Sequence, residues 1–563
     1  MYLQKELGLA FTATIHDIEW ERVNLKISGL IAGDLNADYT FYLKSKDDEL
    51  KIPHQQIERH SFYLSLNITT LNHGDRIPDG HWYIIARNSL GETINVNIAG
   101  NINDCNEYSR EFKSGNKRVY KVHTFEEINR NFGLDIFFDC PINSKRKKVT
   151  FRRRMYDLRV KVYVGIFNFA KKHFKKNGKR ILFTSASRDS MGGNLGAVYN
   201  RLLERRLNKE FTVLKVFKSN IWSRSNLIDK FRLPFYLGIA DYIFLEDYHP
   251  MVNQLTYDKN TEIIQLWHAN GAFKTFGYSR LGKPASPLID GINHRIYTKA
   301  ITSSKHVIPY YAEAFAISED NVISTGIPKT DMFFKEEYRK GKIEKIHKVF
   351  PQIKEAKKVI LFGPTFRGGG PKTAYYPMNK IDFKKMAEYC RANNAIVLFK
   401  MHFLVKNKLI IPQQYRDVLI DATNYREIND ILFVADLLIT DYSSTIYEYS
   451  LLNKPMLFYA FDLEEYIASR DFYDKFEEFV PGKIVKHFDE LMEAIYKEDF
   501  DFDKVKEFRN KNFDYLDGGA SDRVIDWLVL KKRVYDQEYI KLSRATNEYD
   551  GKETAAATLK GDI

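Results

Sequence analysis

The stretch Ile439–Tyr449 constrains the fold most, because an apolar run stops abruptly there at small polar residues. The run covers Ile431–Ile439, and Asp441, Ser443 and Ser444 follow before a helix-permissive segment begins. This pattern predicts a buried parallel strand that delivers both serines to a helix N-terminus. Backbone N–H groups and hydroxyls at such a point are suited to hold a phosphate. The same residues also fit an ordinary helix cap, so other stretches must decide between the two interpretations.

Four further stretches place polar groups directly after short apolar, strand-like runs. They are Gln265–Gly271, Leu361–Gly370, Leu398–His402 and Phe479–Ile484. In an open α/β sheet the carboxyl ends of the strands line one crevice, so residues that are far apart in sequence can converge there. The sequence therefore predicts an α/β fold whose strand ends gather histidine, threonine, arginine and lysine side chains.

Taken together, these motifs resemble those of the CDP-glycerol/CDP-ribitol phosphotransferases that polymerise wall teichoic acid. The motifs that carry the resemblance are Trp267-His268, Pro364–Arg367, Lys400–His402, Asp441–Ser444 and Pro481–Ile484. The stretches Gly271–Thr275 and Tyr459–Glu464 are most similar to the poly(ribitol phosphate) polymerase branch. One departure is Phe403, because members of the family usually carry proline after this histidine.

A length of 563 residues predicts about three domains, each large enough for its own core. Residues 1–140 contain short alternating segments separated by turns, which predicts an accessory β-sandwich or barrel. Two α/β units are expected at 179–345 and 346–500. The resemblance implies that they form a GT-B-like pair of Rossmann-type domains, with the acceptor on the first and the CDP donor on the second. Residues 501–544 are expected to be helical, and the tail, 545–563, to be disordered.

The segment 141–178 is expected to be a basic amphipathic linker helix. Between Lys145 and Arg180 there are fifteen lysines and arginines against a single acid, Asp157, whereas the net charge of the whole chain is +13. An apolar stripe at helical spacing suits an anionic membrane surface, but it equally suits packing against a neighbouring domain. Nucleic acid is not an expected partner, because no recognised nucleic-acid module accompanies the patch.

The cysteines and the N-terminus bear on the compartment. Cys105, Cys140 and Cys390 are widely spaced and form no metal-ligand pattern, which is typical of a reducing cytoplasm. The N-terminus lacks the layout of a signal peptide, and no apolar run approaches the ~18 residues of a membrane span. We therefore expect a cytoplasmic protein that the basic helix holds peripherally on the inner face of the cell membrane.

The chemistry that the resemblance implies is attack by an acceptor hydroxyl on the phosphorus that carries the alditol, with CMP leaving. Positioning and electrostatic stabilisation dominate such a transfer. The resemblance implies that His268 is the base and that His402 contacts phosphate and stabilises the leaving group. The residues expected at the donor diphosphate are Thr365, Arg367, Lys400, Ser443 and Ser444.

Glu448 lies one helical turn beyond Ser444 and is expected to accept hydrogen bonds from the cytidine ribose, while Pro481 and Gly482 approach the cytosine ring. Three further residues rank lower as site candidates: Asp247, His249 and Asp441. Asp441 is expected to act as a structural cap or a positioning acid. No acidic pair or His/Cys cluster has metal-ligand spacing, so no metal and no cofactor is expected, and basic groups are expected to neutralise the diphosphate.

The function expected from these motifs is transfer of ribitol phosphate from CDP-ribitol to an undecaprenyl-diphosphate-linked teichoic acid chain. CDP-glycerol is the close alternative, because the two donors share every charged group. A nucleotide-sugar glycosyltransferase of the same architecture is a second hypothesis, and a non-catalytic scaffold is a third. The full set of histidines and arginine argues against the scaffold. A homo-oligomer is left open.

Overall fold

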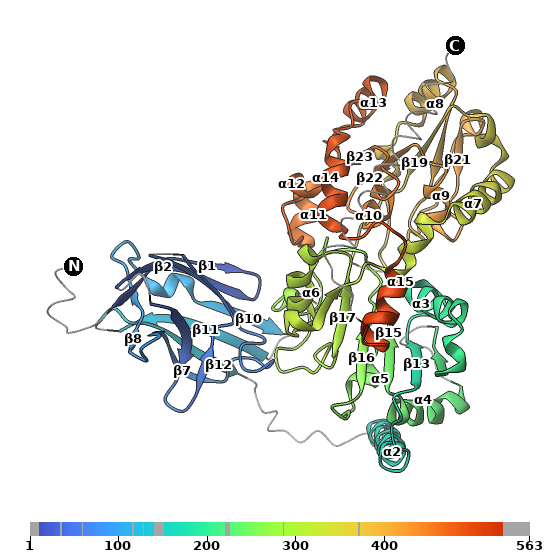
Figure 1. The fold of residues 1–563 in the computed structure, drawn as a ribbon. Helices are drawn as coiled ribbons and strands as arrows, with labels where there is room; N and C mark the ends of the chain where they lie inside the picture. The colour runs from blue at the N-terminus through green and yellow to red at the C-terminus, as the bar shows by residue number, and fades with distance from the viewer. Residues whose placement is uncertain are drawn as a thin grey trace.

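The computed structural model describes residues 11–33, 37–58, 60–114, 118–127, 129–139, 151–219, 226–284, 286–369 and 372–532. Within these residues the chain forms two largely antiparallel sheets, then two parallel sheets (Figure 1). The expectations for the first residues of the chain, for Cys140, for residues 141–150 of the basic linker, for residues 533–544 of the C-terminal helical segment and for the tail 545–563 lie outside the described residues.

The N-terminal domain is a sandwich of two sheets. The first has the order β5 (His54–Glu58), β6 (Ser61–Asn67), β2 (Asn24–Ala32), β1 (Thr12–Glu21) and β9 (Asn97–Ile98). The second has the order β10 (Arg110–Ser114), β11 (Arg118–Glu126), β12 (Phe132–Asp139), β7 (Gly80–Asn88), β3 (Tyr39–Lys44) and β4 (Glu49–Lys51), and β8 (Thr93–Asn95) pairs with β7. Alternation along the strands buries one face of each sheet, for example Leu25 and Ile27 in β2, in a single core. The expected all-β domain is thus confirmed in outline as two packed, largely antiparallel sheets.

The first α/β unit contains a six-stranded parallel sheet. Its order is β14 (Thr212–Phe217), β13 (Arg180–Ser185), β15 (Tyr242–Leu245), β16 (Glu262–Gln265), β17 (Lys299–Thr302) and β18 (Val322–Ser324). The connecting helices are α3 (Gly193–Glu204), α4 (Leu227–Ile239), α5 (Pro250–Asn253) and α6 (Ile308–Phe315). Strand order reverses next to β13, which places a crevice at the carboxyl ends of β13 and β15.

The second α/β unit also contains a six-stranded parallel sheet, but with a different strand order. Its sheet has the order β21 (Leu419–Asp421), β20 (Ala395–Phe399), β19 (Lys358–Phe362), β22 (Leu437–Thr440), β23 (Met456–Tyr459) and β24 (Lys483–Val485). This is the dinucleotide-fold order, in which the strand order reverses between β19 and β22. The helices are α7 (Glu336–Val349), α8 (Phe383–Ala392), α9 (Ile428–Leu432), α10 (Thr445–Ser450), α11 (Leu463–Ser469), α12 (Phe476–Phe479) and α13 (Phe488–Lys497).

Two local strand expectations are wrong. The first half of the run Ile431–Ile439 ends helix α9, so only its second half belongs to strand β22. Short apolar runs fit a buried helix as well as a strand. Here Asp436 lies between helix α9 and strand β22, and its carboxylate accepts the N–H of Val359 at the start of β19 at 2.9 Å. Likewise, Pro481 follows helix α12 and precedes β24, so it does not stand at the end of a strand.

The C-terminal residues join the two units. After α14 (Asp503–Asn512), helix α15 (Ala520–Arg523) and a π-helical turn (Val524–Val529) pack back on the first unit beside β13 and β15 (Figure 1). Asp331 fixes this return, because its carboxylate accepts the N–H groups of Ala520 and Ser521 at 2.9 and 2.8 Å.

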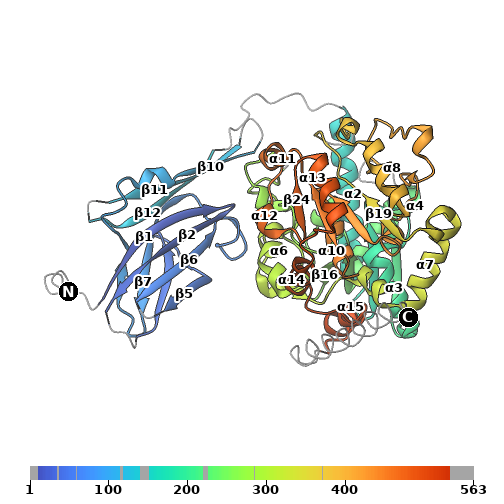
Figure 2. The same cartoon turned by 90° about the horizontal axis from the view of Figure 1, so that it is seen from above.

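Helix α2 (Phe151–His173) packs against α4 at the far end of the first unit (Figures 1 and 2). Its buried side chains are Tyr163, Phe167 and Ala170, so one narrow face of the helix joins the core of the first unit. No helix in the described part of the chain is long and apolar enough to span a bilayer.

Candidate active site

The expected site residues gather where the two α/β units meet, and we call this contact region the junction. Thr275 donates its N–H to the carbonyl of Asp471 at 3.0 Å, and Tyr473 donates back to the carbonyl of Phe273 at 3.1 Å. Gly271 lies against the ring of Tyr447, where an added Cβ would stand 2.2 Å from a ring carbon. Only glycine permits this approach, so the first unit's loop is built to meet the second unit closely.

His268 follows β16 on the first unit and is exposed at the junction. The preceding Trp267 has a left-handed φ of 51°, which is rare for a bulky residue and turns the chain sharply. Asn194 stabilises this turn by donating to the carbonyl of Trp267 at 2.6 Å. The turn therefore presents the imidazole outward.

The hydrogen bond of His268 assigns its tautomer. Its Nδ1 lies 3.3 Å from the carbonyl oxygen of Glu246, which can only accept. Nδ1 therefore carries the proton, and Nε2 keeps a free lone pair. Although one side of His268 is exposed, protein atoms around the rest of the ring desolvate it and lower its pKa. Nearby Lys329 lowers the pKa further, whereas the Glu246 carbonyl and the Asp247 carboxylate raise it. The ring is thus neutral near pH 7 and able to accept a proton at Nε2.

His402 follows β20 on the second unit and has the opposite hydrogen bond. Its Nδ1 accepts the N–H of Leu404 at 3.2 Å, so the neutral ring carries its proton on Nε2. Burial lowers its pKa, and Lys400 and Lys274 lower it further. Phe403 is 78% exposed and its ring stacks on the imidazole with centroids 4.5 Å apart. His402 is therefore arranged to donate a hydrogen bond.

Asp441 is the hub of the donor-side unit. One carboxylate oxygen accepts the N–H and the hydroxyl of Thr365, both at 2.8 Å, and the N–H of Tyr442 at 2.6 Å. The other oxygen accepts Arg367 at 2.8 Å. Because the carboxylate is buried and fully engaged, its contacts are those of a positioning group that ties the end of β19 to the end of β22.

The guanidinium of Arg367, which was expected to contact the diphosphate, is already paired with two carboxylates of the protein. Its Nε and Nη2 form a bidentate pair with Asp462 at 2.5 and 2.9 Å, while Nη1 is taken by Asp441 and by the carbonyl of Thr365. Burial alone would lower the pKa of Arg367, but the two carboxylates raise it. In this arrangement the guanidinium shapes the site, and its contact with the diphosphate stays a prediction.

Ser443 and Ser444 open α10, which has only six residues. The hydroxyl of Ser443 accepts the N–H of Thr445 at 3.3 Å and donates to the Thr445 hydroxyl at 3.0 Å, so it caps its own turn. Ser444 is exposed. A helix this short has little dipole, so any attraction for phosphate comes from the hydroxyl and N–H groups themselves.

Two lysines approach the donor side. Lys400 is buried, which lowers its pKa, and its amine donates to the carbonyl of Thr423 at 2.9 Å. Lys274 crosses from the first unit and donates to the hydroxyl of Tyr466 at 2.8 Å. Burial lowers the pKa of Lys274 to about 8, opposed by Asp441 and assisted by Arg470 and Arg367. Lys274 is thus a cation that loses its charge only slightly above neutral pH.

Glu448 is bound across the junction. Lys329 on the first unit donates to its carboxylate at 3.0 Å and to the carbonyl of His268 at 2.9 Å. The backbone N–H of Lys329 is held in turn by Asn194 at 2.9 Å. Lys329 therefore links the residue expected at the ribose to the backbone of the residue expected to be the base.

Comparison with known proteins shows which protein family has this fold and these motifs. A family model described as CDP-Glycerol:Poly(glycerophosphate) glycerophosphotransferase matches residues 166–530, the two α/β units together. The chain belongs to this family. It is therefore a CDP-alditol phosphotransferase, and the family resemblance inferred from the motifs is confirmed.

Relatives extend the match beyond the two units. The teichoic acid ribitol-phosphate polymerase TarL of Staphylococcus aureus is 43% identical over 552 residues, which covers 91% of this chain and 98% of the relative. TarK of the same organism, which carries the same description, is 51% identical over 384 residues, covering 68% and 74%. The solved structure of the wall teichoic acid polymerase TagF matches with a TM-score of 0.52 at 19% identity, over 68% of this chain and 96% of its own. That likeness shows a shared fold.

The remaining expected residues of the phosphotransferase form no hydrogen bond or ion pair across the junction among the described residues, although the Asp247 carboxylate lies close enough to raise the pKa of His268. Asp247 and His249 are buried behind β15, where Asp247 accepts the hydroxyl of Ser185 at 2.6 Å. Burial lowers the pKa of His249, against the nearby carboxylate of Asp247. A Cβ added to Gly482 would stand 2.3 Å from the carbonyl oxygen of Met456, so close packing against β23 explains this glycine. The contacts of Pro481 and Gly482 with cytosine stay predictions.

Sequence reasoning missed three residues of the phosphotransferase junction: Lys274, Lys329 and Asp462. Lys274 and Asp462 lie in stretches that carried the family resemblance, but the residue types in these stretches do not indicate which side chain each of them contacts. Lys329 follows β18 in the run Gly326–Lys329, where a strand end, a glycine and a proline signal a turn. Among the described residues, no group of three His, Cys, Asp or Glu side chains is placed to hold a metal ion.

Proposed function

We propose that the protein is a teichoic acid polymerase that transfers ribitol phosphate from CDP-ribitol to the terminal hydroxyl of a lipid-linked poly(alditol phosphate) chain and releases CMP. The relatives that match most of the chain are ribitol-phosphate polymerases by name. One observation carries the proposal: two histidines on opposite units have opposite tautomers, one ready to accept a proton and one ready to donate a hydrogen bond.

In the proposed mechanism, Nε2 of His268 accepts the proton of the acceptor hydroxyl. The hydroxyl oxygen forms a bond to the phosphorus that bears the alditol, and the bond from that phosphorus to the oxygen of CMP breaks. The electron pair of the broken bond leaves with CMP. Nε2–H of His402 and the amine of Lys274 donate to the phosphate oxygens, where negative charge builds up as the bond breaks.

The donor is proposed to lie along the second unit. Its diphosphate would lie at Thr365, Ser443, Ser444 and Lys400, with Arg367 fixing the loop. Glu448 would bind the ribose, and Pro481 and Gly482 would lie at the cytosine. We propose that these cations neutralise the diphosphate without a required metal ion, so transfer would continue at full rate in a chelator.

We also propose that the protein acts at the inner face of the cytoplasmic membrane, held by α2 and α4. Exposed apolar side chains project from both helices although the two pack together: Leu158, Val162 and Phe169 from α2, and Leu227, Ile228 and Phe231 from α4. Nine lysines and arginines lie in the segment from Arg152 to Lys176. Basic charge beside exposed apolar groups favours an anionic bilayer surface. The double variant Phe169→Glu and Phe231→Glu should abolish sedimentation with phosphatidylglycerol vesicles.

The test of the donor is CMP release from CDP-ribitol and from CDP-glycerol, with and without a lipid-linked glycerol-phosphate primer. Primer-dependent release from CDP-ribitol supports the proposal. Release from CDP-glycerol alone would assign the protein to the glycerol branch, which the description of the family model also fits. No release from either donor, with folded protein and intact primer, would refute the proposal.

A further inference from the structure

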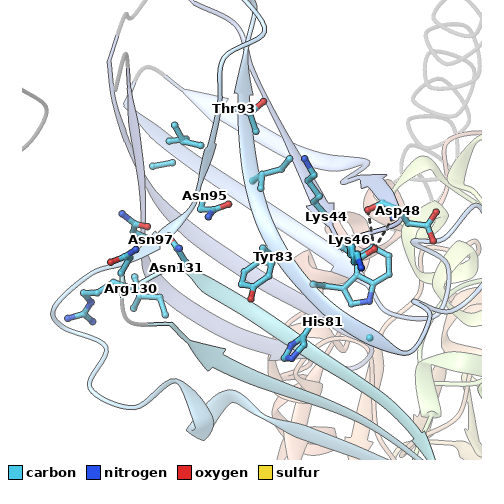
Figure 3. Close-up of a pocket in the computed structure, with 18 of the residues that line it drawn as sticks. Lys44, Lys46, Asp48, His81, Tyr83, Thr93, Asn95, Asn97, Arg130 and Asn131 are labelled. Carbon is cyan, nitrogen blue, oxygen red and sulfur yellow. Dashed lines mark hydrogen bonds between the residues drawn. The ribbon is translucent and has the colours of Figure 1, made fainter. Parts of the chain in front are cut away.

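The N-terminal sandwich contains a groove far from the junction. It opens between the edge of the first sheet, at β1 and β9, and strands β3, β7 and β8 of the second (Figure 3). Its volume is about 1180 Å³, large enough for several units of an extended chain. Trp82, Ile85 and Ile94 are buried beneath it, whereas most side chains on its rim are polar.

We propose that this groove binds the poly(alditol phosphate) chain behind its growing end. The inference rests on the proposed function for the identity of the polymer. It adds a second binding site, separate from the junction, whose ligand is an alternation of polyol and phosphodiester. The side chains that line the groove match both parts of this ligand.

Amide and hydroxyl groups supply the match to a polyol. Asn95, Asn97 and Asn131 line the groove, and none of their side-chain amides has a hydrogen-bond partner among the described residues. Figure 3 shows Asn97 and Asn131 close together at one side, with Asn95 beside them. A carboxamide offers both donors and an acceptor, so it can bind two neighbouring hydroxyls of an open-chain polyol. Thr12 and Thr14 add hydroxyls on β1.

Two lysines supply the match to a phosphodiester. Lys44 and Lys46 lie at the other side of the groove, and neither forms an ion pair with any described residue (Figure 3). Each amine can bind a phosphate oxygen as a point charge. Asp47 and Asp48 follow on the same loop and offset the positive charge, so the groove is not a general polyanion site. Hydroxyl recognition has to supply the rest of the affinity.

A nucleic acid fits the groove less well. Binding of single strands relies on exposed aromatic faces that stack on the bases. Trp82 is buried, and the hydroxyl of Tyr83 is held by Glu127 at 2.5 Å. His81 is paired with Asp135. Tyr83 is half-buried and His81 is exposed, and both are already engaged by carboxylates, so amide and hydroxyl groups outnumber free aromatic faces on the rim and favour polyol hydroxyls over bases.

The sandwich is attached to the acceptor-side unit. At the tip of the β1–β2 hairpin, Arg22 forms a bidentate pair with Glu313 of α6 at 2.7 and 3.2 Å. The same guanidinium lies 5.1 Å from the ring centroid of Tyr473. Arg118 pairs with Asp290 at 3.0 Å. These contacts hold the groove in a fixed place relative to the unit that carries His268, which is the unit expected to hold the acceptor (Figure 1).

A second site on the same molecule acts through effective concentration. A chain long enough to lie in the groove while its end reaches the junction rebinds there as an intramolecular event. A short acceptor cannot reach both places and gains nothing. The groove therefore predicts that acceptors of many units have a lower KM than acceptors of one or two units.

The test compares a groove variant with a matched surface variant in the full-length protein. The groove variant is Lys46→Ala with Asn95→Ala and Asn97→Ala. The control is Lys51→Ala with Asn103→Ala and Asn106→Ala, which removes exposed side chains of the same kinds, in the same numbers, from the same domain outside the groove. CMP release from the active donor is measured with single-unit and with long poly(ribitol phosphate) acceptors.

The groove variant should raise KM for the long acceptor roughly ten-fold, because tethering is worth at least that much. It should leave KM for the single-unit acceptor and for the donor unchanged, and the control should behave like the wild type. Binding of radiolabelled poly(ribitol phosphate) should fall in parallel, while poly(A) RNA should not compete. An unchanged KM for long acceptors, an equal loss with short acceptors, or competition by RNA would overturn the inference. If the wild type releases no CMP at all, the proposed function fails instead, and polymer binding by the groove is still measured directly.

Discussion

His268 and His402 are the same residue type, and each follows a parallel strand, β16 or β20, yet the two units give them opposite chemistry. A backbone carbonyl accepts from Nδ1 of His268, whereas a backbone N–H donates to Nδ1 of His402. The first ring is left with a lone pair on Nε2 and the second with a proton there. The comparison teaches that one backbone partner, at the far nitrogen, decides whether a histidine acts as base or as donor.

The surroundings of the two histidines differ as well. On the first unit, His268 is exposed, and the amine of Lys329 donates a hydrogen bond to its backbone carbonyl. On the second unit, the carboxylates of Asp441 and Asp462 tie down Arg367 and Thr365 before any ligand arrives. The acceptor side has internal pairs of its own, because Arg188 pairs with Glu246 and Ser185 donates to Asp247. What distinguishes the donor side is a buried cation, Arg367, that its carboxylates hold in place.

The largest effect is expected from His268→Gln. Glutamine fills the space and can donate, but it cannot take a proton from a hydroxyl. Transfer should fall ~10²–10⁴-fold, the range of general-base catalysis, while affinity for CDP-ribitol stays the same. Single-turnover CMP release and donor binding by calorimetry measure the two quantities. A well-folded variant that retains near-normal turnover would remove His268 from the role of base.

A smaller effect is expected at His402, and it should depend on the substitution. His402→Ala removes the Nε2–H donor and should cost about 10²-fold in kcat. His402→Gln places an N–H close to the same point and should recover much of that loss. The contrast with His268→Gln sharpens the comparison, because glutamine can replace a donor but not a base. Equal losses for the two glutamine variants would contradict the assignment of opposite tautomers.

The pH dependence of kcat/KM should report on His268 at its acidic limb and on Lys274 at its alkaline limb. The pKa of His268 lies below its ordinary value, so kcat/KM should fall as the pH drops through that pKa and the base becomes protonated. Lys274 has a pKa of about 8, so kcat/KM should also fall as the pH rises past it and the cation is lost. Lys274→Arg, which stays charged, should flatten the alkaline limb alone. An alkaline limb that persists unchanged in this variant would exclude Lys274 as its source.

The smallest effect is expected from Phe403→Pro, which restores the residue usual in the family. Phe403 is exposed and touches His402 by stacking, so its loss changes transfer by about two-fold. The hydrogen bond from Leu404 to His402 should survive, since it does not involve position 403. A ten-fold change in CMP release would show that the stacked ring sets the orientation of the imidazole.

Much of this architecture follows from local patterns. Alternation over 1–140 predicted a β-sandwich or barrel, and the structure has a sandwich. Apolar runs that end in polar residues placed His268, Thr365, His402 and Asp441 at strand ends, where the structure has them. Strand ends are readable because burial and turn chemistry act between near neighbours. The run before Asp441 was misjudged in its first half, because a short buried helix and a short buried strand have the same composition.

The sequence by itself therefore determined most of the residues that stand at the carboxyl edges of the two sheets, and it determined the family. Only the tertiary structure decided their partners: Asp462 for Arg367, Lys329 for Glu448, and one backbone group for each histidine. The physical reason is distance along the chain. The pairs of Arg367 with Asp462 and of Lys329 with Glu448 span 95 and 119 positions, and the carbonyl that sets the tautomer of His268 is 22 positions away, so no periodicity announces them. His402 is the exception in distance, because its partner Leu404 is two residues on, but the direction of that bond depends on the shape of the turn and not on its residue types.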